Sequence, residues 1–228
     1  MVTDAVIVRR SRFVPVTLAA FVLIVTFVSV PAYSHDLVAV TESGRLVVLA
    51  SVDTDVTNLA ITCKGHDLRF SDPVIDIEGF DRLEKLRELN FYHVPQIASF
   101  AFLSSCTSLE RLSISFARVR SLDFLRSMPR IVALHLEYSD DWESEHGLPF
   151  ATAPIDLSEN RNLEYLAFRL CDLKRPPVFV NVPAALKYVD LAYNPMEIDD
   201  RDIAALDALS SVEKVYIFGA KIDDPILD

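Results

Sequence analysis

The chain has 228 residues, enough for one domain, and because 51% of them are hydrophobic and 24% charged it can bury a core and is not intrinsically disordered. Its 22 basic and 33 acidic residues give a net charge of −11, which argues against nucleic-acid binding, since that function requires a basic face. Three cysteines are too few for a disulfide-stapled scaffold, and five glycines leave little material for phosphate-binding loops.

The N-terminal 34 residues have the three parts of a secretory signal peptide. A basic flank at residues 9–12 precedes an uncharged run of 17 residues, 14–30, and small residues stand at positions −3 and −1 of a cut before His35. A run of this length also almost suffices to span a bilayer of about 30 Å. The sequence therefore predicts export, with residues 1–34 as a cleaved signal peptide or, as the alternative, an uncleaved membrane anchor.

A β-hairpin is predicted directly after this segment. Apolar runs at residues 38–40 and 46–50 flank the turn sequence Glu42-Ser43-Gly44-Arg45. We expect residues 35–55 to form a cap on the N-terminal end of the repeats that follow.

From residue 56 to residue 222 the chain repeats. The triplet apolar-x-x-apolar-x-apolar begins at residues 86, 109, 131, 163, 186 and 212, and all 18 of its positions are apolar. Three of the five intervals are 22 or 23 residues, which independent strands would not keep. Between triplets, apolar residues recur at every third position, as in the series Ile97, Phe100, Leu103, Cys106 and Leu109. Such a unit is typical of a solenoid turn, which buries its apolar edge only by stacking on the next turn.

These units resemble the leucine-rich repeat family, particularly its 22-residue internalin-like class with the pattern L-x-x-L-x-L-x-x-N-x-I-x-x-L-x-x-L. The best match is residues 186–195, where Leu191-Ala192-Tyr193-Asn194-Pro195 fits the strand exit. The family's Asn or Cys position holds Asn194 and Cys171, but other residues in the remaining turns, namely Val94, Ala117, Ser139 and Ala220. The resemblance implies an α/β fold, a solenoid of six to seven turns with a parallel β-sheet on its concave face. An earlier triplet, Val56, Leu59 and Ile61, is compatible with a degenerate first strand.

The last repeat is predicted to contain a short helix. Asp199 and Asp200 precede Ile203, Leu206 and Leu209, which are apolar at intervals of three, and acidic residues favour a helix N-terminus. Residues 223–228 then form a C-terminal tail.

The cysteines indicate where the protein acts. Cys106 and Cys171 fall on inward positions, where small buried apolar residues are expected, whereas the pairing of Cys63 stays open. Neither flank carries the cysteine clusters found on many animal and plant extracellular repeat domains. This favours a bacterial exported protein, secreted or periplasmic, with membrane anchoring by the N-terminal segment as the alternative.

One turn is about ten residues longer than the others. It lies between Ile131 and Leu163 and contains the only tryptophan, Trp142, beside four acidic residues. Long loops on a repeat scaffold are often functional. The alternative is a tolerated surface insertion, because extra loop length costs little free energy.

The sequence contains no motif for catalysis. It has no metalloprotease helix, nucleophile elbow, phosphate loop or dinucleotide fingerprint. Cys63 and His66 are three residues apart, but no second pair completes a zinc site. We therefore predict a protein that is not an enzyme and binds no cofactor and no metal.

The repeat does provide a surface. Residues two, four and six positions after each triplet start should point outward on the concave face. Five of these 18 residues are aromatic, and acidic and basic residues number three each, so the face is neutral. Aromatic residues with isolated arginines are typical anchors of protein interfaces, although strands also favour Tyr and Phe for their β-propensity alone. The predicted protein-binding residues are Tyr92, Arg111, His135, Tyr138, Tyr165, Arg169, Tyr188, Tyr193 and Tyr216 on this face and its edge, and Trp142 in the long turn.

The sequence thus predicts an exported, non-enzymatic protein that recognises a protein partner through its concave face. The alternative is an inhibitor whose acidic exterior attracts, and which then occludes, a basic partner enzyme. We expect no nucleic-acid partner, and membrane contact only if the N-terminal segment stays uncleaved. Truncation of the outward-facing Tyr165 or Tyr188 should cost under about 0.5 kcal/mol of folding free energy, as at ordinary surface sites.

Overall fold

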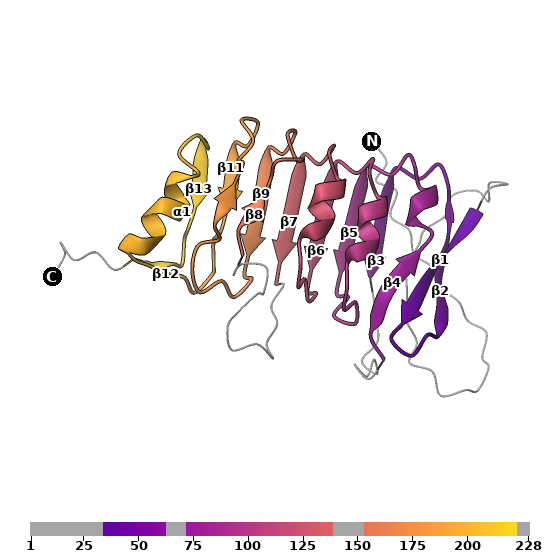
Figure 1. Ribbon diagram of the computed structural model, residues 1–228. Coiled ribbons are helices and arrows are strands. Elements are labelled where there is room, and N and C mark those ends of the chain that lie inside the picture. The colour runs from indigo at the N-terminus through magenta and orange to yellow at the C-terminus, as the bar shows by residue number, and fades with distance from the viewer. Residues whose placement is uncertain (1–33, 63–71, 139–152, 223–228) are drawn as a thin grey trace.

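The computed structural model describes residues 34–62, 72–138 and 153–222 (Figure 1). Within this part of the chain, short strands run side by side along an elongated molecule, and short helices cover part of the side opposite the main sheet. The predicted signal segment up to residue 33, Cys63, His66, Trp142 and the tail 223–228 lie outside the described residues. No helix in the described ranges is long and apolar enough to cross a membrane.

Seven strands form one parallel sheet in the order β13-β11-β9-β7-β6-β5-β3. These strands are β3 (Asn58–Thr62), β5 (Glu88–Tyr92), β6 (Arg111–Ser115), β7 (Ala133–Glu137), β9 (Tyr165–Arg169), β11 (Tyr188–Asp190) and β13 (Lys214–Tyr216). Each turn of the chain leaves the sheet and returns to it one strand further on, which is the topology of a solenoid. The numbers missing from this order belong to strands of smaller sheets.

The register of the sheet is the register of the sequence repeat. The second apolar residue of every triplet pairs with its counterpart in the next turn, in the order Leu59, Leu89, Leu112, Leu134, Leu166, Val189 and Val215. The first six of these side chains are buried, with at most 2% of their surface exposed. The structure therefore confirms the predicted α/β leucine-rich repeat solenoid, and Val56, Leu59 and Ile61 belong to its first turn.

Each series of apolar residues spaced by three passes through one of three 3-10 helices. These are η1 (Phe80–Arg82), η2 (Ala101–Ser105) and η3 (Asp123–Ser127). Three residues per turn place positions i and i+3 on the same side, so a three-residue period buries one side of this helix type. The one α-helix of the described residues is α1 (Ile203–Asp207), which follows η5 (Asp200–Asp202) in the region predicted to be helical.

Two small sheets connect neighbouring turns away from the main sheet. In one, β8 (Ile155–Asp156) pairs in parallel with β10 (Phe179–Val180), and in the other β12 (Glu197–Ile198) pairs in parallel with β14 (Lys221–Ile222). These pairs satisfy backbone groups where the chain passes between turns.

The N-terminal end of the solenoid carries an antiparallel sheet (Figure 1). The expected hairpin is present as β1 (Ser34–Thr41) and β2 (Leu46–Asp53), and β4 (Val74–Glu78) adds to it unexpectedly on the other side of β1. Leu37 and Ala39 of β1 are fully buried and join the same core as the repeats. Gly79 ends β4 with a φ of 104°, and a Cβ there would lie 2.7 Å from the Asp36 carbonyl oxygen, so only glycine fits this approach.

The last turn differs from the others, because no further turn packs against it among the described residues. Val215 is 36% exposed although its counterparts in the preceding turns are buried, and Phe218 is 72% exposed. In this turn the second triplet position, Val215, is therefore exposed, whereas Val212 and Ile217 are partly buried and pack against the core. An inward position is buried only when a neighbouring turn covers it.

Candidate protein-binding surface

The outward side chains of the seven-stranded sheet form one continuous surface, which we call the sheet face and which is the face expected to be concave. Its columns follow the predicted register: Tyr165 is opposite Tyr188, which is opposite Lys214. On the other half of the sheet, Arg111 lies between Glu88 and Ala133.

Two tyrosines form the centre of the C-terminal half of this face. Tyr165 and Tyr188 are neighbours on β9 and β11, and the Lys214 Nζ atom lies 5.8 Å from the centre of the Tyr188 ring. Both tyrosines are half-buried, so they are less exposed than the sequence pattern alone suggested. Burial, and then the nearby Asp190 carboxylate, raise the pKa of the Tyr165 hydroxyl, which therefore stays protonated at neutral pH.

Arg169 connects this centre to the edge of the sheet. Its guanidinium carbon lies 5.2 Å from the centre of the Tyr193 ring, a cation–π distance. Its Nε lies 3.5 Å from Oδ2 of Asp190, an ion-pair contact without a hydrogen bond. These two contacts hold the side chain of Arg169 across β11.

His135 lies in the middle of the sheet face, between Ser113 and Ala167 of the adjacent strands. Burial lowers the pKa of its imidazole, so the ring is neutral at pH 7. Its Nε2 atom is buried and has no hydrogen-bond partner among the described residues.

Several outward positions are not solvent-exposed. Ala167 and Ala192 are buried on the sheet face, and Ser115 is only 8% exposed. Their side chains are small enough to be covered by larger neighbours on the adjacent strands. The large side chains therefore stand out and gather in two aromatic regions of the sheet face, of which the second is the group of Tyr165, Tyr188 and Tyr193 described above.

The first aromatic region lies at the exits of β5, β6 and β7. Here the His93 and Phe116 rings stack with centroids 4.4 Å apart, and Phe116 and Tyr138 stack at 4.5 Å. The Tyr92 ring stands almost perpendicular to Phe116 at 5.4 Å. Tyr92 and Tyr138 are more than 40% exposed, so this stack is accessible.

The backbone conformation at the exits of the sheet strands was not predicted from the sequence. The residue seven positions after each triplet start has a left-handed φ, between 50° and 61°, in five turns. We call these residues the left-handed column; they are His93, Phe116, Tyr138, Leu170 and Tyr193. Gly219 occupies the same position in the last turn with a φ of 93°. That single glycine was the only sequence signal for this conformation, because bulky residues rarely adopt it.

The structure thus separates the predicted site residues into groups. Tyr165, Arg169, Tyr188, Tyr193 and Tyr216 gather on and beside β9, β11 and β13. Tyr92 and Tyr138 belong to the first aromatic region, whereas Arg111 starts β6, two strands from Tyr165. Trp142 lies outside the described residues.

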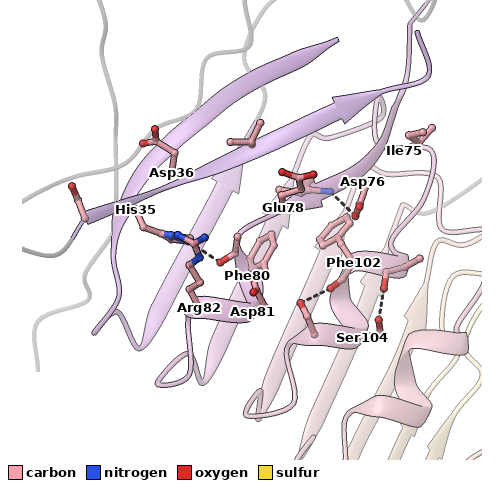
Figure 2. Close-up of a pocket in the computed structure, with 16 residues that line it drawn as sticks. His35, Asp36, Ile75, Asp76, Glu78, Phe80, Asp81, Arg82, Phe102 and Ser104 are labelled. Atoms are coloured by element: carbon pink, nitrogen blue, oxygen red, sulfur yellow. Dashed lines mark hydrogen bonds between the residues drawn. The ribbon is translucent and has the colours of Figure 1, made fainter. Parts of the chain in front are cut away.

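A groove lies at the N-terminal cap, between β1, β4 and the helices η1 and η2 (Figure 2). This groove has a volume of about 990 Å³, and four acidic residues line it, Asp36, Asp76, Glu78 and Asp81, against one arginine, Arg82. At one end, His35 Nε2 donates a hydrogen bond to the Gly79 carbonyl at 2.7 Å. The described residues contain no group of three or more His, Cys, Asp or Glu side chains suited to a metal ion.

Fold and surface define a leucine-rich repeat solenoid with an aromatic sheet face. Similar solved structures are an internalin (InlF) and internalin C2, both from Listeria monocytogenes. InlF is 17% identical over 78% of this chain with a TM-score of 0.42, and internalin C2 is 18% identical over 78% with a TM-score of 0.46. This chain covers 59% of the InlF structure and 70% of the internalin C2 structure. The likeness concerns the fold alone, and the repeat assignment rests on the sheet register.

No protein-family model and no curated protein sequence matches the chain.

Proposed function

We propose that this protein is an exported, non-enzymatic binding protein that recognises another protein through its sheet face. The observation that carries the proposal is the pairing of Tyr165 with Tyr188 in register, flanked by the cation–π contacts of Arg169 and Lys214. Tyr and Arg dominate the energetics of protein interfaces. Side chains held by their neighbours lose little conformational entropy on binding, which favours affinity.

Charge also supports recognition through this face. The chain carries a net charge of −11, but the outward positions of the sheet include equal numbers of acidic and basic residues. A neutral, aromatic patch on an acidic protein can approach a partner without the repulsion that the rest of the surface would impose.

The test uses the protein as its host exports it, purified, as bait for a partner protein. Tyr165→Ala and Tyr188→Ala should each weaken the captured partner's affinity by roughly thirtyfold, which corresponds to about 2 kcal/mol. Val178→Ala, at an exposed apolar site next to β10 and away from the sheet face, is the matched control and should leave affinity unchanged. If both tyrosine variants bind normally, the assignment to this face is wrong, and the turn containing Trp142 becomes the next candidate.

The excess of acidic residues supports a second function, an inhibitor that occludes a basic partner enzyme. Electrostatic steering would make its association rate fall at least about tenfold from low to high salt. Recognition anchored by Tyr165 and Tyr188 should change little over the same range. Stopped-flow association kinetics at several ionic strengths distinguish the two.

The export part of the proposal rests on the basic flank, apolar run and small residues before His35. Mass spectrometry of the native protein should find His35 at the N-terminus. Recovery of the uncut chain from membranes would instead support an anchor, with the repeats on the far side of the membrane.

A further inference from the structure

The groove at the N-terminal cap lies along one edge of β4 (Figure 2). At its start, β4 is fixed on this side by Val74, whose carbonyl accepts a hydrogen bond from the Ala98 N–H at 2.7 Å and whose N–H donates to the Gln96 carbonyl at 2.9 Å. Past Val74, β4 pairs with β1 on its other side and ends the three-stranded sheet β2-β1-β4. Residues 75–78 therefore form an open strand edge in the ranges that the structure describes.

Ile77 directs its backbone groups to this open edge. Thr41 donates its N–H to the Arg45 carbonyl across the β1–β2 hairpin, so Ala39, two residues earlier, also directs its backbone groups to β2. Ile77 lies opposite Ala39 and therefore directs its N–H and C=O away from β1. Its N–H donates to Oδ1 of Asp76, its neighbour in sequence, at 2.9 Å. Backbone groups on an unpaired edge are a template for another strand.

The side chains along the groove determine which strand fits. No salt bridge within the described part of the chain involves the four acidic side chains that line it, which are Asp36, Asp76, Glu78 and Asp81. Arg82 is the one Lys or Arg side chain among the lining residues. This excess of negative charge attracts a basic strand and repels an acidic one. A second copy of this chain that used the same edge would bring the same four acids, so it is not the occupant.

Exposed apolar side chains lie beside the acids. Ile75 is 43% exposed and lines the groove together with Val38 of β1, the residue opposite Glu78. Val38 in turn lies opposite Val48 of β2, which is 56% exposed. Lys and Arg pack the apolar stems of their side chains on such residues while their charged ends reach acidic groups. The groove therefore suits basic side chains better than an acidic surface without apolar residues would.

We infer that the open edge of β4 pairs with an extended, basic segment of a partner protein, which lies in the groove. Recognition by strand addition takes its affinity from backbone hydrogen bonds and its specificity from alternate side chains. Asp76 and Glu78 are exposed, whereas Ile77 between them is buried. A paired strand alternates in the same way, so its basic residues lie beside the two acids and the residues between them point to the opposite side.

The probe is a synthetic peptide of four Lys-Val repeats, whose binding to the exported protein is measured by fluorescence anisotropy. It should bind at least about tenfold tighter than a peptide of four Lys-Pro repeats, which has the same charge but lacks the N–H groups of alternate residues. A peptide of four Glu-Val repeats should not bind.

Three results of this experiment would overturn the inference. Equal affinities of the Lys-Val and Lys-Pro peptides would mean that charge alone explains binding. Equal affinities of the Lys-Val and Glu-Val peptides would mean that the acids select nothing. Failure of the Lys-Val peptide to bind would leave the edge without the proposed ligand.

Variants locate the site. Glu78→Lys should weaken the Lys-Val peptide at least about tenfold, because it replaces an attraction by a repulsion. Glu84→Lys is the matched control: Glu84 is also exposed and the net charge changes equally, but it does not line the groove. Ser104→Trp places a ring in the groove from η2 and should weaken binding as much, whereas Thr107→Trp, just after η2 and outside the groove, should not. Equal losses from Glu78→Lys and Glu84→Lys would contradict the site.

This site goes beyond the proposed function, because it would hold a second partner segment away from the sheet face, and the two proposals fail separately. If no basic peptide binds while Tyr165→Ala still weakens a captured partner, the inference is wrong and the proposed function stands. If the peptide binds at Glu78 while Tyr165 and Tyr188 prove irrelevant, the anchor of the proposed function is wrong instead.

Discussion

Asn194 is the polar residue on which the exit of β11 depends. Its Oδ1 accepts hydrogen bonds from the backbone N–H groups of Cys171 and Leu173 at 2.8 and 3.2 Å, and its Nδ2 donates to the Phe168 carbonyl at 2.6 Å. The turn of Val94 lacks this side chain, and there the Val94 N–H donates to the Phe116 carbonyl instead. Turns without the Asn can therefore use the backbone of the next turn.

We expect Asn194→Ala to lower the free energy of unfolding by roughly 3 kcal/mol, because several buried backbone groups lose their partners at once. Urea unfolding followed by circular dichroism measures the change. Asn162→Ala is the control: Asn162 is exposed and donates one hydrogen bond to the Pro129 carbonyl, so its loss should cost at most about 0.5 kcal/mol. Similar losses from both substitutions would show that Asn194 has no special role.

The Cys106 thiol gives the protein an alkaline pH dependence. Burial raises the pKa of this thiol from 9.0 to about 12. The folded state therefore keeps the thiol neutral while the unfolded chain ionises above about pH 9. The contribution of this thiol to the free energy of unfolding is therefore fully present below about pH 9 and is lost as the pH rises toward 12.

Cys106→Ala should remove the contribution of this thiol to the fall of the unfolding free energy with rising pH. Between about pH 9 and 11 the wild type should lose up to about 1.4 kcal/mol per pH unit more than the variant, as linkage requires for one titrating group. Urea unfolding of both proteins at several pH values gives the difference between their unfolding free energies. The effects of the other titrating groups cancel in this difference. Parallel curves would mean that the thiol ionises in the folded state.

Strand β9 shows how one element serves core and surface. Leu166 is fully buried between Leu134 and Val189, whereas Tyr165, its neighbour in sequence, lies on the sheet face. Because Tyr165 is half-buried, its truncation should cost about 1 kcal/mol of folding free energy rather than the 0.5 kcal/mol expected from the sequence.

Leu166→Ala should destabilise the protein by roughly 2–5 kcal/mol, because it leaves a cavity between turns. Thermal or urea unfolding of Leu166→Ala and Tyr165→Ala, measured side by side, tests the assignment of the two faces. The critical result is which variant loses more unfolding free energy. A larger loss for Tyr165→Ala would mean that Tyr165 faces the core and Leu166 faces outward.

Strand β4 was not predicted from the sequence. Its residues 74–78 contain Ile77, which also begins the series of apolar residues spaced by three. Local spacing therefore favoured a turn of the solenoid, but pairing with β1 draws the segment into the cap. Strand pairing depends on a distant partner, which local periodicity does not encode.

At the scale of the whole molecule, the two ends differ. The cap of β1, β2 and β4 covers the first turn, whereas β13 at the other end is exposed along its length within the described residues. In a solenoid, each turn is stabilised mainly by its neighbours. Stability should therefore decrease toward β13.

Hydrogen exchange measured by mass spectrometry should detect this gradient. Backbone amides of residues 214–216 should exchange at least about tenfold faster than those of residues 111–115, because β13 has a sheet neighbour on one side and β6 on both. The Ser113 region serves as the internal reference. Equal protection would imply that another part of the chain or a second molecule covers β13.

Local sequence patterns were enough to predict the repeat, the register of six strands, the hairpin at the N-terminus and the outward columns that contain Tyr165 and Tyr188. These features follow from apolar residues that recur in every turn, and such a pattern buries enough surface only when turns stack in register. Four features became visible only in the folded protein: which outward residues are accessible, that β4 joins the cap, that Val215 is exposed and that the column from His93 to Tyr193 is left-handed. Each of these depends on the size or presence of a neighbour in another turn, and a pattern along one chain does not contain that neighbour.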